Sequence, residues 1–465
     1  MAGGNCCKFL GSNYLTHVIP RSPRRGICFS PNSSPNKCDL RLARPADALL
    51  SCFLATLKPF QPYRYSSQAG DPAKLLTQPY DKISPAMQAK YIAASPYNLV
   101  RVILGERRDT DTPTDNVYTR SAKYFEDWMK QGILAQDAAP GFYAYFQEFE
   151  VPDSGEKLTR KGFIGLGKVE DYEANIVFRH EKTLAGPKKD RLEVLTHTRA
   201  HFGQIFMLYP DRAGDVDREL DAAQSSKPVL DVVDDYGARH ILYAITDPTR
   251  IKRIQELMAP MKLLIADGHH RYETALNYRN LHPDDPSAQY VMMTFVNMYS
   301  PGLRILATHR VLSNLDLTAV DGLLSHAKSP WTSRAFASLA DLKKELETPK
   351  PQSVRIGVVT SKQLSLLERP RKKDEMDVPV LHNEIIGGWL GIGEEAVRDE
   401  KFIHYVRGID AAVADVREKG AQVAFLLEPT PIDDMARIAF GGGVMPQKST
   451  DFYPKLLTGI AIYKL

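Results

Sequence analysis

The stretch Lys262-Leu-Leu-Ile-Ala-Asp-Gly-His-His-Arg-Tyr-Glu-Thr-Ala-Leu276 determines which fold we expect for this chain. It begins with the apolar run Leu263–Ala266, which is typical of a buried strand. Asp267 and Gly268 interrupt the run, and glycine permits the tight turn that a strand-to-helix junction requires. From His269 onward the residues favour a helix. The stretch therefore predicts a strand, a turn and a helix, which is the alternation typical of α/β proteins.

The predicted first turn of this helix brings together His269, His270 and Arg271. The first N–H groups of a helix lack intrahelical partners, and with the helix dipole they favour a bound anion. A guanidinium can donate two parallel hydrogen bonds to phosphate oxygens. Imidazoles can donate to phosphate or exchange protons near neutral pH. Together with Asp267 this pattern indicates phosphate chemistry. The alternative is a capped structural helix with a surface arginine.

A charged segment from His180 to Arg191 is the second candidate for this chemistry. Its Glu181 is a candidate general base, and Lys188 and Arg191 are cations that can hold an anionic substrate. Gly186-Pro187 interrupts the segment, and a rigid turn presents loop residues reproducibly. The alternative is a solvated loop of alternating charge.

The third candidate follows three glycines at 441–443 and contains Lys448, Ser449 and Thr450. Glycines let backbone N–H groups approach an anion, while the lysine and hydroxyls add a charge and hydrogen-bonding groups. The segment is not a Walker A motif, because the spacing and order of its glycines and lysine are wrong. A plain C-terminal turn is the alternative.

Two turns rich in aromatic and proline residues, at 78–81 and 95–98, are candidates for a substrate pocket. Such turns also occur as purely structural packing elements. The residues predicted to line the pocket are Tyr80, Asp81, Asn98 and His180.

Composition and the distribution of charge limit the classes of protein to consider. The 465 residues are 43% hydrophobic and 25% charged, as in ordinary globular proteins, and no apolar run is long enough to span a membrane. Residues 1–52 carry a net charge of +5, which leaves the rest of the chain at about −1. A near-neutral core offers no global field for nucleic acid, so we expect neither a nucleic-acid nor a membrane partner.

All five cysteines lie in the first 52 residues, which excludes a disulfide framework or a thiol nucleophile from the remainder. Residues 1–57 are interpreted as a disordered or targeting-like extension. We expect a cytoplasmic protein, with organelle targeting left open by this extension. No HExxH, GxSxG or paired CxxC motif occurs, and no GxGxxG follows a predicted strand, so zincins, α/β-hydrolases and nicotinamide-dependent enzymes are not favoured.

Apolar periodicity predicts an α/β fold with mixed sheets. We expect a main α/β domain at 58–311 and a smaller α/β portion at 312–465, whose glycine-rich loop returns to the site. The predicted strands are 99–104, 142–150, 158–169, 206–209, 240–244, 263–266, 290–298, 303–311, 354–359, 363–367 and 423–427. The predicted helices are 87–93, 115–130, 189–200, 217–223, 248–257, 339–347 and one near 396.

From about residue 58 to 465 the chain resembles the uncharacterised family DUF1015. Several separate signature segments in the same order carry the resemblance, and residues 1–57 have no counterpart in it. The segments are Gln78-Pro-Tyr-Asp81, Ser95-Pro-Tyr-Asn98, His180-Glu-Lys-Thr183, Ala266-Asp-Gly-His-His-Arg-Tyr-Glu-Thr-Ala275 and Pro446-Gln-Lys-Ser-Thr450.

A more distant likeness gives a more specific indication of the chemistry. Gly268-His-His-Arg-Tyr-Glu-Thr-Ala275 is similar to the nucleotide-contacting Gly-x-x-Arg box of the ParB/sulfiredoxin superfamily. That superfamily includes CTP-binding partition proteins, ATP-using sulfiredoxins and free-serine kinases. His269 stands where sulfiredoxin has its cysteine, so sulfinic-acid reduction is excluded. No helix-turn-helix or basic DNA face is evident, which leaves nucleotide-dependent phosphoryl transfer on a ParB/sulfiredoxin-like core.

The resemblance thus implies a phosphotransferase that uses ATP or ADP with Mg²⁺ on a small hydroxylated metabolite such as free serine. The alternatives are a phosphatase of a small phosphorylated metabolite and a nucleotide-binding regulator without turnover. Glu181, Asp267 and His270 are the predicted catalytic residues, with Glu181 or Asp267 accepting the hydroxyl proton. The predicted nucleotide- and phosphate-binding residues are Gly268, His269, Arg271, Lys188, Arg191, Lys448, Ser449 and Thr450.

Overall fold

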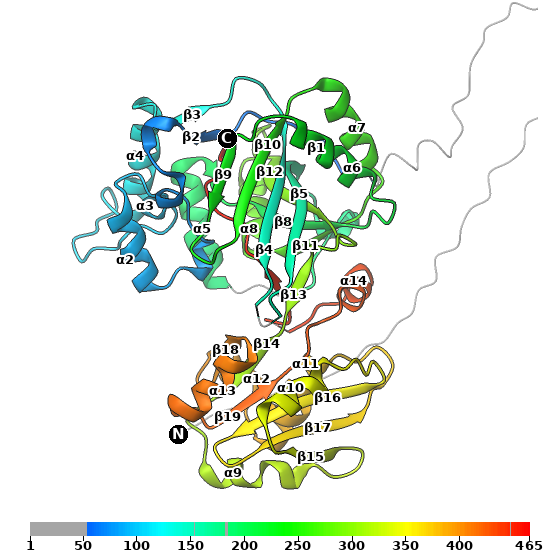
Figure 1. The fold of residues 1–465 in the computed structure, drawn as a ribbon. Helices are drawn as coiled ribbons and strands as arrows, with labels where there is room; N and C mark the ends of the chain where they lie inside the picture. Colours follow the sequence, from blue (N-terminus) through cyan, green and yellow to red (C-terminus); the bar gives the residue numbers. More distant parts are fainter. Residues whose placement is uncertain (1–53, 153, 182–184, 447) are drawn as a thin grey trace, which may run out of the picture. The chain divides into compact units, whose positions relative to one another are not determined.

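The computed structural model describes residues 54–152, 154–181, 185–446 and 448–465. Its largest sheet has nine strands and is mixed, which confirms the predicted α/β class (Figure 1). Within it, β11 pairs in parallel with β6 and β12 with β8, while the other pairs are antiparallel. The order is β6 (Val177–Phe178), β11 (Leu263–Asp267), β8 (Ile205–Tyr209), β12 (Tyr290–Asn297), β5 (Lys157–Lys168), β4 (Phe142–Glu150), β10 (Arg239–Ile245) and β9 (Leu230–Val233), with β1 (Leu57–Lys58) beside β5.

Both faces of this sheet are buried, because alternate side chains of its strands enter two different hydrophobic clusters. Strands covered on both faces have nearly continuous apolar sequences, as the run in β11 does. The C-terminal residues of the chain and α14 (Ile432–Phe440) cover one face. The other face is covered by α6 (Asp215–Asp221), α7 (Pro248–Met258) and α8 (His269–Leu281).

A third cluster joins helices from the N-terminal part of the described chain to α5 (Ala185–Thr198). In this cluster, Asn116 is the N-cap residue of α4 and forms a reciprocal capping box with Thr119. The helices of this part are α2 (Pro85–Ala94), α3 (Val100–Ile103) and α4 (Val117–Lys130).

The strand predicted at 99–104 is wrong, because these residues form α3. Leu99, Val100 and Val102 are fully buried, so the apolar run lies inside a helical cluster rather than in a sheet. The Asn98 side chain accepts a hydrogen bond from the Val100 N–H and favours the helical turn. A short apolar run is compatible with either structure, and only its packing partners distinguish the two.

A second, six-stranded sheet is antiparallel and has helices on both faces (Figure 1). One face packs against α10 (Leu339–Glu347) and α13 (Ile409–Glu418). The other packs against α11 (Asp377–Val380) and the π-helix η8 (Leu381–Trp389). The strand order is β15 (Thr332–Phe336), β17 (Leu364–Pro370), β16 (Ser353–Thr360), β19 (Val423–Leu426), β14 (Thr308–Leu312) and β18 (Ile403–Arg407).

The single strand predicted at 303–311 is divided between two sheets. Its first part is β13 (Arg304–Leu306), which pairs with β20 (Asp451–Tyr453), and its second part is β14 of the six-stranded sheet. After β19 the chain turns back, and residues 448–455, which we call the returning segment, carry β20. The chain ends in β21 (Tyr463–Lys464), paired with β7 (Ala200–His201). The returning segment is therefore placed by pairing with distant residues.

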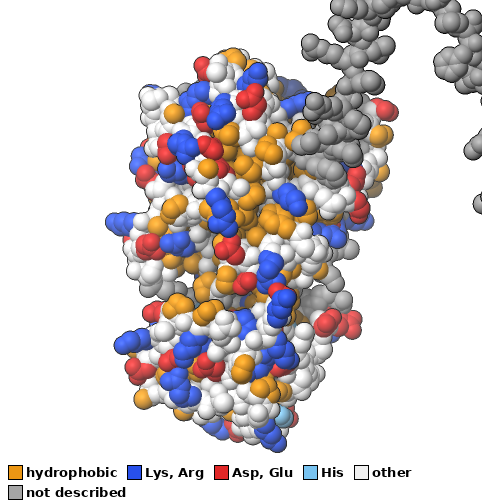
Figure 2. All heavy atoms as spheres, turned by 90° about the vertical axis from the view of Figure 1, so that its right-hand side faces the viewer, with side chains coloured by type: hydrophobic (Ala, Val, Ile, Leu, Met, Phe, Trp, Pro, Cys, Tyr) orange, Lys and Arg blue, Asp and Glu red, His pale blue; other side chains and the backbone are white. Residues whose placement is uncertain are grey.

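Charges on the surface are mixed in sign. Lys and Arg side chains alternate with Asp and Glu over the face shown in Figure 2. Among the described helices, none is long and apolar enough to cross a bilayer.

Candidate functional site

A β-bulge at the end of β11 sets the position of Asp267. β11 pairs with β8 in a register that shifts between Ile265 and Asp267, so that Asp267 stands opposite Phe206. A bulge inserts one extra residue and changes the direction of the next side chain. As a result the Asp267 carboxylate lies 3.0 Å from the Arg271 guanidinium and 3.8 Å from the Lys455 ammonium. Burial opposes its ionisation, but Lys455 and Arg271 hold the pKa of Asp267 well below its ordinary value.

Helix α8 begins directly after this bulge, at Gly268. Gly268 has φ 94° and, as the N-cap residue without a side chain, provides no cap hydrogen bond to the first turn. A Cβ atom on Gly268 would lie 2.9 Å from Nε of Arg271. Glycine therefore allows both the left-handed turn and the return of the Arg271 side chain over it. The N–H groups at the start of a helix favour a bound anion.

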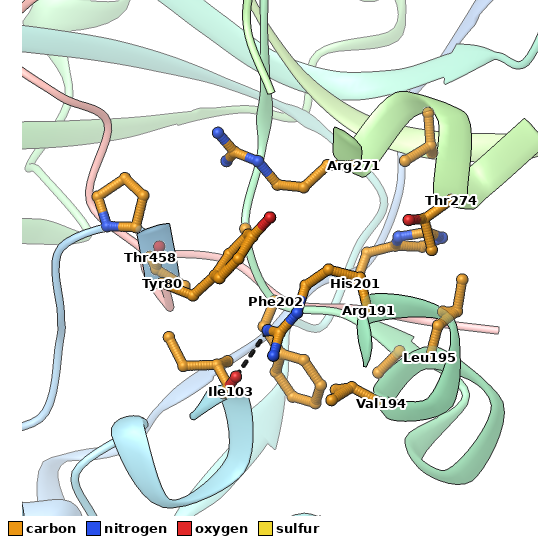
Figure 3. A pocket seen from close by; sticks show the side chains of 14 residues that line it. Tyr80, Ile103, Arg191, Val194, Leu195, His201, Phe202, Arg271, Thr274 and Thr458 are labelled. Atoms are coloured by element: carbon orange, nitrogen blue, oxygen red, sulfur yellow. Dashed lines mark hydrogen bonds between the residues drawn. The ribbon is translucent and has the colours of Figure 1, made fainter. Parts of the chain in front are cut away.

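Arg271 lies at the edge of a cavity of about 70 Å³ that also contains Arg191 (Figure 3). Arg271 donates to the Gln204 carbonyl and to Asp267. Arg191 donates to the Ile103 carbonyl at 2.6 Å, pairs with Asp190 and stacks 4.1 Å from the Tyr80 ring centroid. Tyr80 lies between the two guanidinium groups in Figure 3. The apolar wall is formed mainly by Ile103, Val194, Leu195, Ala200, Phe202 and Val291.

Glu181 joins the end of β6 to the C-terminal part of the chain. It forms a parallel bridge with Met445, and the Met445 N–H donates to the His180 carbonyl at 2.7 Å. Burial raises the pKa of Glu181 to about 7, against the opposing influence of Lys448, Lys455 and Lys82. A carboxyl group that exchanges its proton near neutral pH, among three lysines, suits general-base chemistry on an anionic substrate.

His180, which precedes Glu181, and His269 pack against each other, and both are neutral near pH 7. His180 is fully buried; its Nδ1 bonds to the Ile265 carbonyl and its Nε2 to Oγ1 of Thr450, both at 2.8 Å. Burial lowers the pKa of His180 to about 4 and places that of His269 well below its ordinary value. The predicted role of His269 as a phosphate ligand is thus limited to a neutral donor, and His180 connects β11 to Thr450.

His270, the third predicted histidine, is half-buried at the start of α8. Burial lowers its pKa, while Glu273 acts in the opposite direction. The charges of Lys188, Asp81 and Lys448 also act on the pKa of His270.

The charged cluster around Glu181 and Asp267 also includes Lys455, Lys82 and Asp451, whose roles no sequence motif indicates. The Lys455 ammonium is 3.1 Å from Asp451, and only 9% of its side chain is exposed. Although burial opposes it, Asp267 and Asp451 raise the pKa of Lys455. Burial and the nearby Lys455 and Lys448 lower that of Lys82. No spacing rule marks these residues, because they meet only through the return of the chain.

Buried polar side chains of the main sheet hold the backbone around Lys455. Arg160 of β5 is 1% exposed and donates to the carbonyls of Tyr453 and Pro454. Gln147 of β4 donates to the Lys455 carbonyl at 3.0 Å. These hydrogen bonds therefore fix the backbone from which the Lys455 side chain extends.

Other predicted site residues take part in internal contacts. Asn98 is fully buried and also donates to the Lys74 carbonyl at 2.8 Å, which favours a structural role. Lys188 pairs with Glu273 of α8. The Ser449 hydroxyl donates to the Pro446 carbonyl at 2.6 Å. Lys182, Thr183 and Gln447 of the predicted segments lie outside the described residues.

Several buried polar atoms near this site have no hydrogen-bond partner among the described residues. They include Nε2 of His269 and both side-chain polar atoms of Gln204, whose carbonyl accepts a hydrogen bond from Arg271. Buried polar atoms are almost always paired with protein, water or ligand. In the described part of the chain, no group of three His, Cys, Asp or Glu residues is arranged to hold a metal ion.

Several solved structures show a distant likeness to this chain. A conserved hypothetical protein from Pyrococcus furiosus has 11% identity and a TM-score of 0.34, covering 62% of this chain and 92% of that one. A free serine kinase in complex with AMP has 11% identity and a TM-score of 0.34, covering 61% and 89%. SbnI with a C-terminal truncation, from Staphylococcus aureus, has 11% identity and a TM-score of 0.34, covering 64% and 87%.

Among curated proteins, no significant match to this chain was found. The family model of a protein of unknown function, DUF1015, matches residues 57–384, which is more than half of the chain. That span includes the bulge of β11, the first turn of α8 and Glu181. The chain belongs to the DUF1015 family.

Proposed function

We propose that this protein transfers a phosphoryl group from a nucleotide to the hydroxyl group of a small metabolite, for which free serine is one candidate. The observation that supports the proposal is that the charges of Lys82, Lys448 and Lys455 all act on one carboxyl group, that of Glu181. Asp267, at the turn into α8, also acts on this carboxyl group and lies 3.8 Å from the Lys455 ammonium, so these charges extend to the start of α8.

The cationic groups account for the handling of the phosphates. Phosphoryl transfer spreads negative charge over the transferred oxygens, and catalysis comes mainly from positioning and from neutralisation of that charge. Arg271 and the N–H groups of the first turn of α8 would hold the nucleotide phosphates. Lys448 and Lys455 would neutralise the charge that develops on the transferred group.

The structure favours Glu181 over Asp267 as the base that accepts the hydroxyl proton. Asp267 pairs with Arg271 and Lys455, and its pKa is held well below the ordinary value, so it is a weak base. Glu181, with its pKa raised to about 7, is partly ionised at neutral pH and binds a proton readily. Glu181 would therefore take the proton while the hydroxyl oxygen attacks the terminal phosphorus, whose bond to the bridging oxygen of the nucleotide breaks and releases ADP from ATP, or AMP from ADP.

ATP or ADP with Mg²⁺ is the proposed donor. Mg²⁺ is usually held by one or two carboxylates together with substrate phosphates, and it neutralises phosphate charge. Asp267 and Glu181 are two of the carboxyl groups near this site. Because Asp267 already pairs with two cations, the ion would be held largely by the phosphates of the nucleotide.

The test is incubation of the purified protein with ATP, ADP or CTP, Mg²⁺ and a mixture of hydroxylated metabolites that includes serine. New phosphorylated species would be followed by mass spectrometry, with Glu181→Gln as the matched inactive variant. Calorimetric binding of a nucleotide without any transfer over hours would instead indicate a regulator. Nucleotide-independent loss of phosphate from phosphorylated metabolites would indicate a phosphatase. Either result would overturn the proposal.

A further inference from the structure

The six-stranded sheet contacts the returning segment through Arg310 of β14. Arg310 is 1% exposed and donates to the Lys448 carbonyl at 3.0 Å. The same guanidinium also donates to the Thr308 carbonyl and to Nε2 of His382 in η8. Burial lowers the pKa of His382 to about 4, so its ring is neutral and able to accept. Arg310 therefore has fixed contacts on three sides.

Lys448 has a backbone conformation that requires such support. Its φ is 59°, in the left-handed region that residues with a Cβ atom seldom adopt. A conformation of this kind persists only where the surroundings hold it. Arg310 binds the Lys448 carbonyl, and Thr430 donates to the next carbonyl, that of Ser449, at 2.9 Å. The backbone from which the Lys448 side chain extends is thus held from the side of the six-stranded sheet.

A second arginine of the same sheet acts on Lys455. Nε of Arg407, at the end of β18, donates to Oδ2 of Asp451 at 2.6 Å. The other oxygen of Asp451 lies 3.1 Å from the Lys455 ammonium, which in turn lies 3.8 Å from Asp267. The charges Arg407, Asp451, Lys455 and Asp267 thus form an alternating chain from the six-stranded sheet to the turn before α8.

We propose that Arg310 and Arg407 are positioning residues, through which the six-stranded sheet sets the places of Lys448 and Lys455 at the site. The use of these lysines for phosphoryl transfer rests on the proposed function, whereas their placement does not. Lysine side chains are long and flexible, so a lysine acts reproducibly only if its backbone and its counter-ion are fixed. A misplacement of about 1 Å at such a site can lower turnover by about a hundredfold.

The test compares two variants of the full-length protein with two matched controls. Arg407→Ala removes the hydrogen bond from Arg407 to Asp451. Its control, Arg334→Ala, removes a half-exposed arginine of the same sheet that pairs with Glu345. Arg310→Lys keeps the positive charge but removes the guanidinium that donates several hydrogen bonds. Its control, Arg355→Lys, makes the same change at a fully buried arginine that donates to the carbonyls of Glu345 and Leu346. Each control disturbs the six-stranded sheet without contacting the returning segment.

The first readout is independent of enzymatic activity. Lysines are acetylated briefly with acetic anhydride, and the extent at each lysine is measured by peptide mass spectrometry. Because Lys455 is 9% exposed, its amine should react slowly in the wild type and severalfold faster in Arg407→Ala. Equal labelling of Lys455 in Arg407→Ala and Arg334→Ala would overturn the proposal.

The second readout is turnover and its dependence on pH. The charged groups that act on Glu181 are Lys448, Asp267, Lys455 and Lys82, and Tyr405 of β18 also interacts with it. Since Lys448 favours the ionised form, its displacement in Arg310→Lys should move the acid limb of the kcat/KM profile to higher pH. Turnover should fall by roughly tenfold to a hundredfold in both test variants and in neither control.

The two proposals fail separately. Absence of phosphoryl transfer in the wild type with every nucleotide would refute the proposed function, while the labelling result would still decide the placement of Lys455. Wild-type transfer with an unchanged pH profile and turnover in Arg310→Lys would refute the positioning role of Arg310.

Discussion

Glu181 is a residue whose proton equilibrium links stability to pH. Its pKa is raised to about 7 in the folded protein, mainly by burial, so between its ordinary value and pH 7 this carboxyl group binds a proton more tightly in the folded state than in the unfolded state. The contribution of Glu181 to the free energy of unfolding should therefore fall as pH rises through this window, whereas the buried histidines, whose pKa values are lowered, contribute with the opposite sign. A tenfold change in proton affinity corresponds to about 1.4 kcal/mol, so the loss from Glu181 should be about 2 kcal/mol between pH 5 and pH 8.

Glu181→Gln tests this link, because glutamine keeps the shape and cannot ionise. In urea unfolding at pH 5 and pH 8, the variant should gain stability over the wild type, and the gain should be larger at pH 8. Glu126→Gln, at an exposed position of α4, is the control and should follow the wild-type curve. A gain for Glu181→Gln that is the same at both pH values would contradict burial as the source of the raised pKa.

Arg271 is the residue whose loss should affect phosphate binding most. Removal of a cation that acts on the transition state costs roughly 2–4 kcal/mol by analogy with an oxyanion donor, so Arg271→Ala should lower turnover by about a hundredfold or more. The fold should survive, as judged by an unchanged circular dichroism spectrum. Arg279→Ala, on the same helix, removes contacts with Val169 and Asp171 and is the matched control. Near-normal turnover in Arg271→Ala would refute its assignment to the site.

At the scale of elements, the junction between β11 and α8 depends on Gly268. Its φ of 94° disfavours any residue with a Cβ atom, and that atom would also lie 2.9 Å from Nε of Arg271. Gly268→Ala should lower stability by about 1–2 kcal/mol through the backbone and should also displace the Arg271 guanidinium. We therefore expect reduced stability in urea and reduced turnover together.

Gly237 provides a precise comparison for that variant. It also has a positive φ, 81°, but a Cβ atom there would meet nothing within 4 Å. Gly237→Ala should show a similar loss of stability with turnover close to that of the wild type. If both variants lost turnover equally, the contact with Arg271 would not explain the effect of Gly268→Ala.

At the scale of the whole molecule, Arg160 connects the main sheet to the returning segment. It bonds the Tyr453 and Pro454 carbonyls and Gln147 while almost completely buried, so its removal leaves buried acceptors without donors. Arg160→Met should lower the free energy of unfolding by about 2–4 kcal/mol. The measurement is urea unfolding followed by fluorescence.

The adjacent Lys161 supplies the control for this prediction. It pairs with Asp221 at the surface, with 32% and 44% of the two side chains exposed, so Lys161→Met should change stability by less than about 1 kcal/mol. An equal effect of the two substitutions would show that Arg160 has no special part in holding the C-terminal segment.

Local features were determined by the sequence itself. The apolar run ending in Asp267-Gly268 predicted β11, the turn and α8, because strand, turn and helix there depend on neighbouring residues. The sequence also suggested candidate residues such as Glu181 and Arg271, since their types suit phosphate chemistry, and their roles remain predictions. Where the local sequence was ambiguous, the prediction failed. The strand predicted at 99–104 is wrong, because a short buried apolar run is compatible with either a strand or a helix.

Only the tertiary structure decided which charges meet. Lys455, Lys82 and Asp451 join Glu181 and Asp267 after the chain has returned to the main sheet. That return depends on contacts such as Arg160 with Pro454, 294 residues apart in the sequence. Burial likewise decided that His180 and His269 are neutral and that Glu181 binds a proton near pH 7. The pKa of each group depends on solvent exclusion and on charges brought close by folding, and neither is encoded in the spacing of residues along the chain.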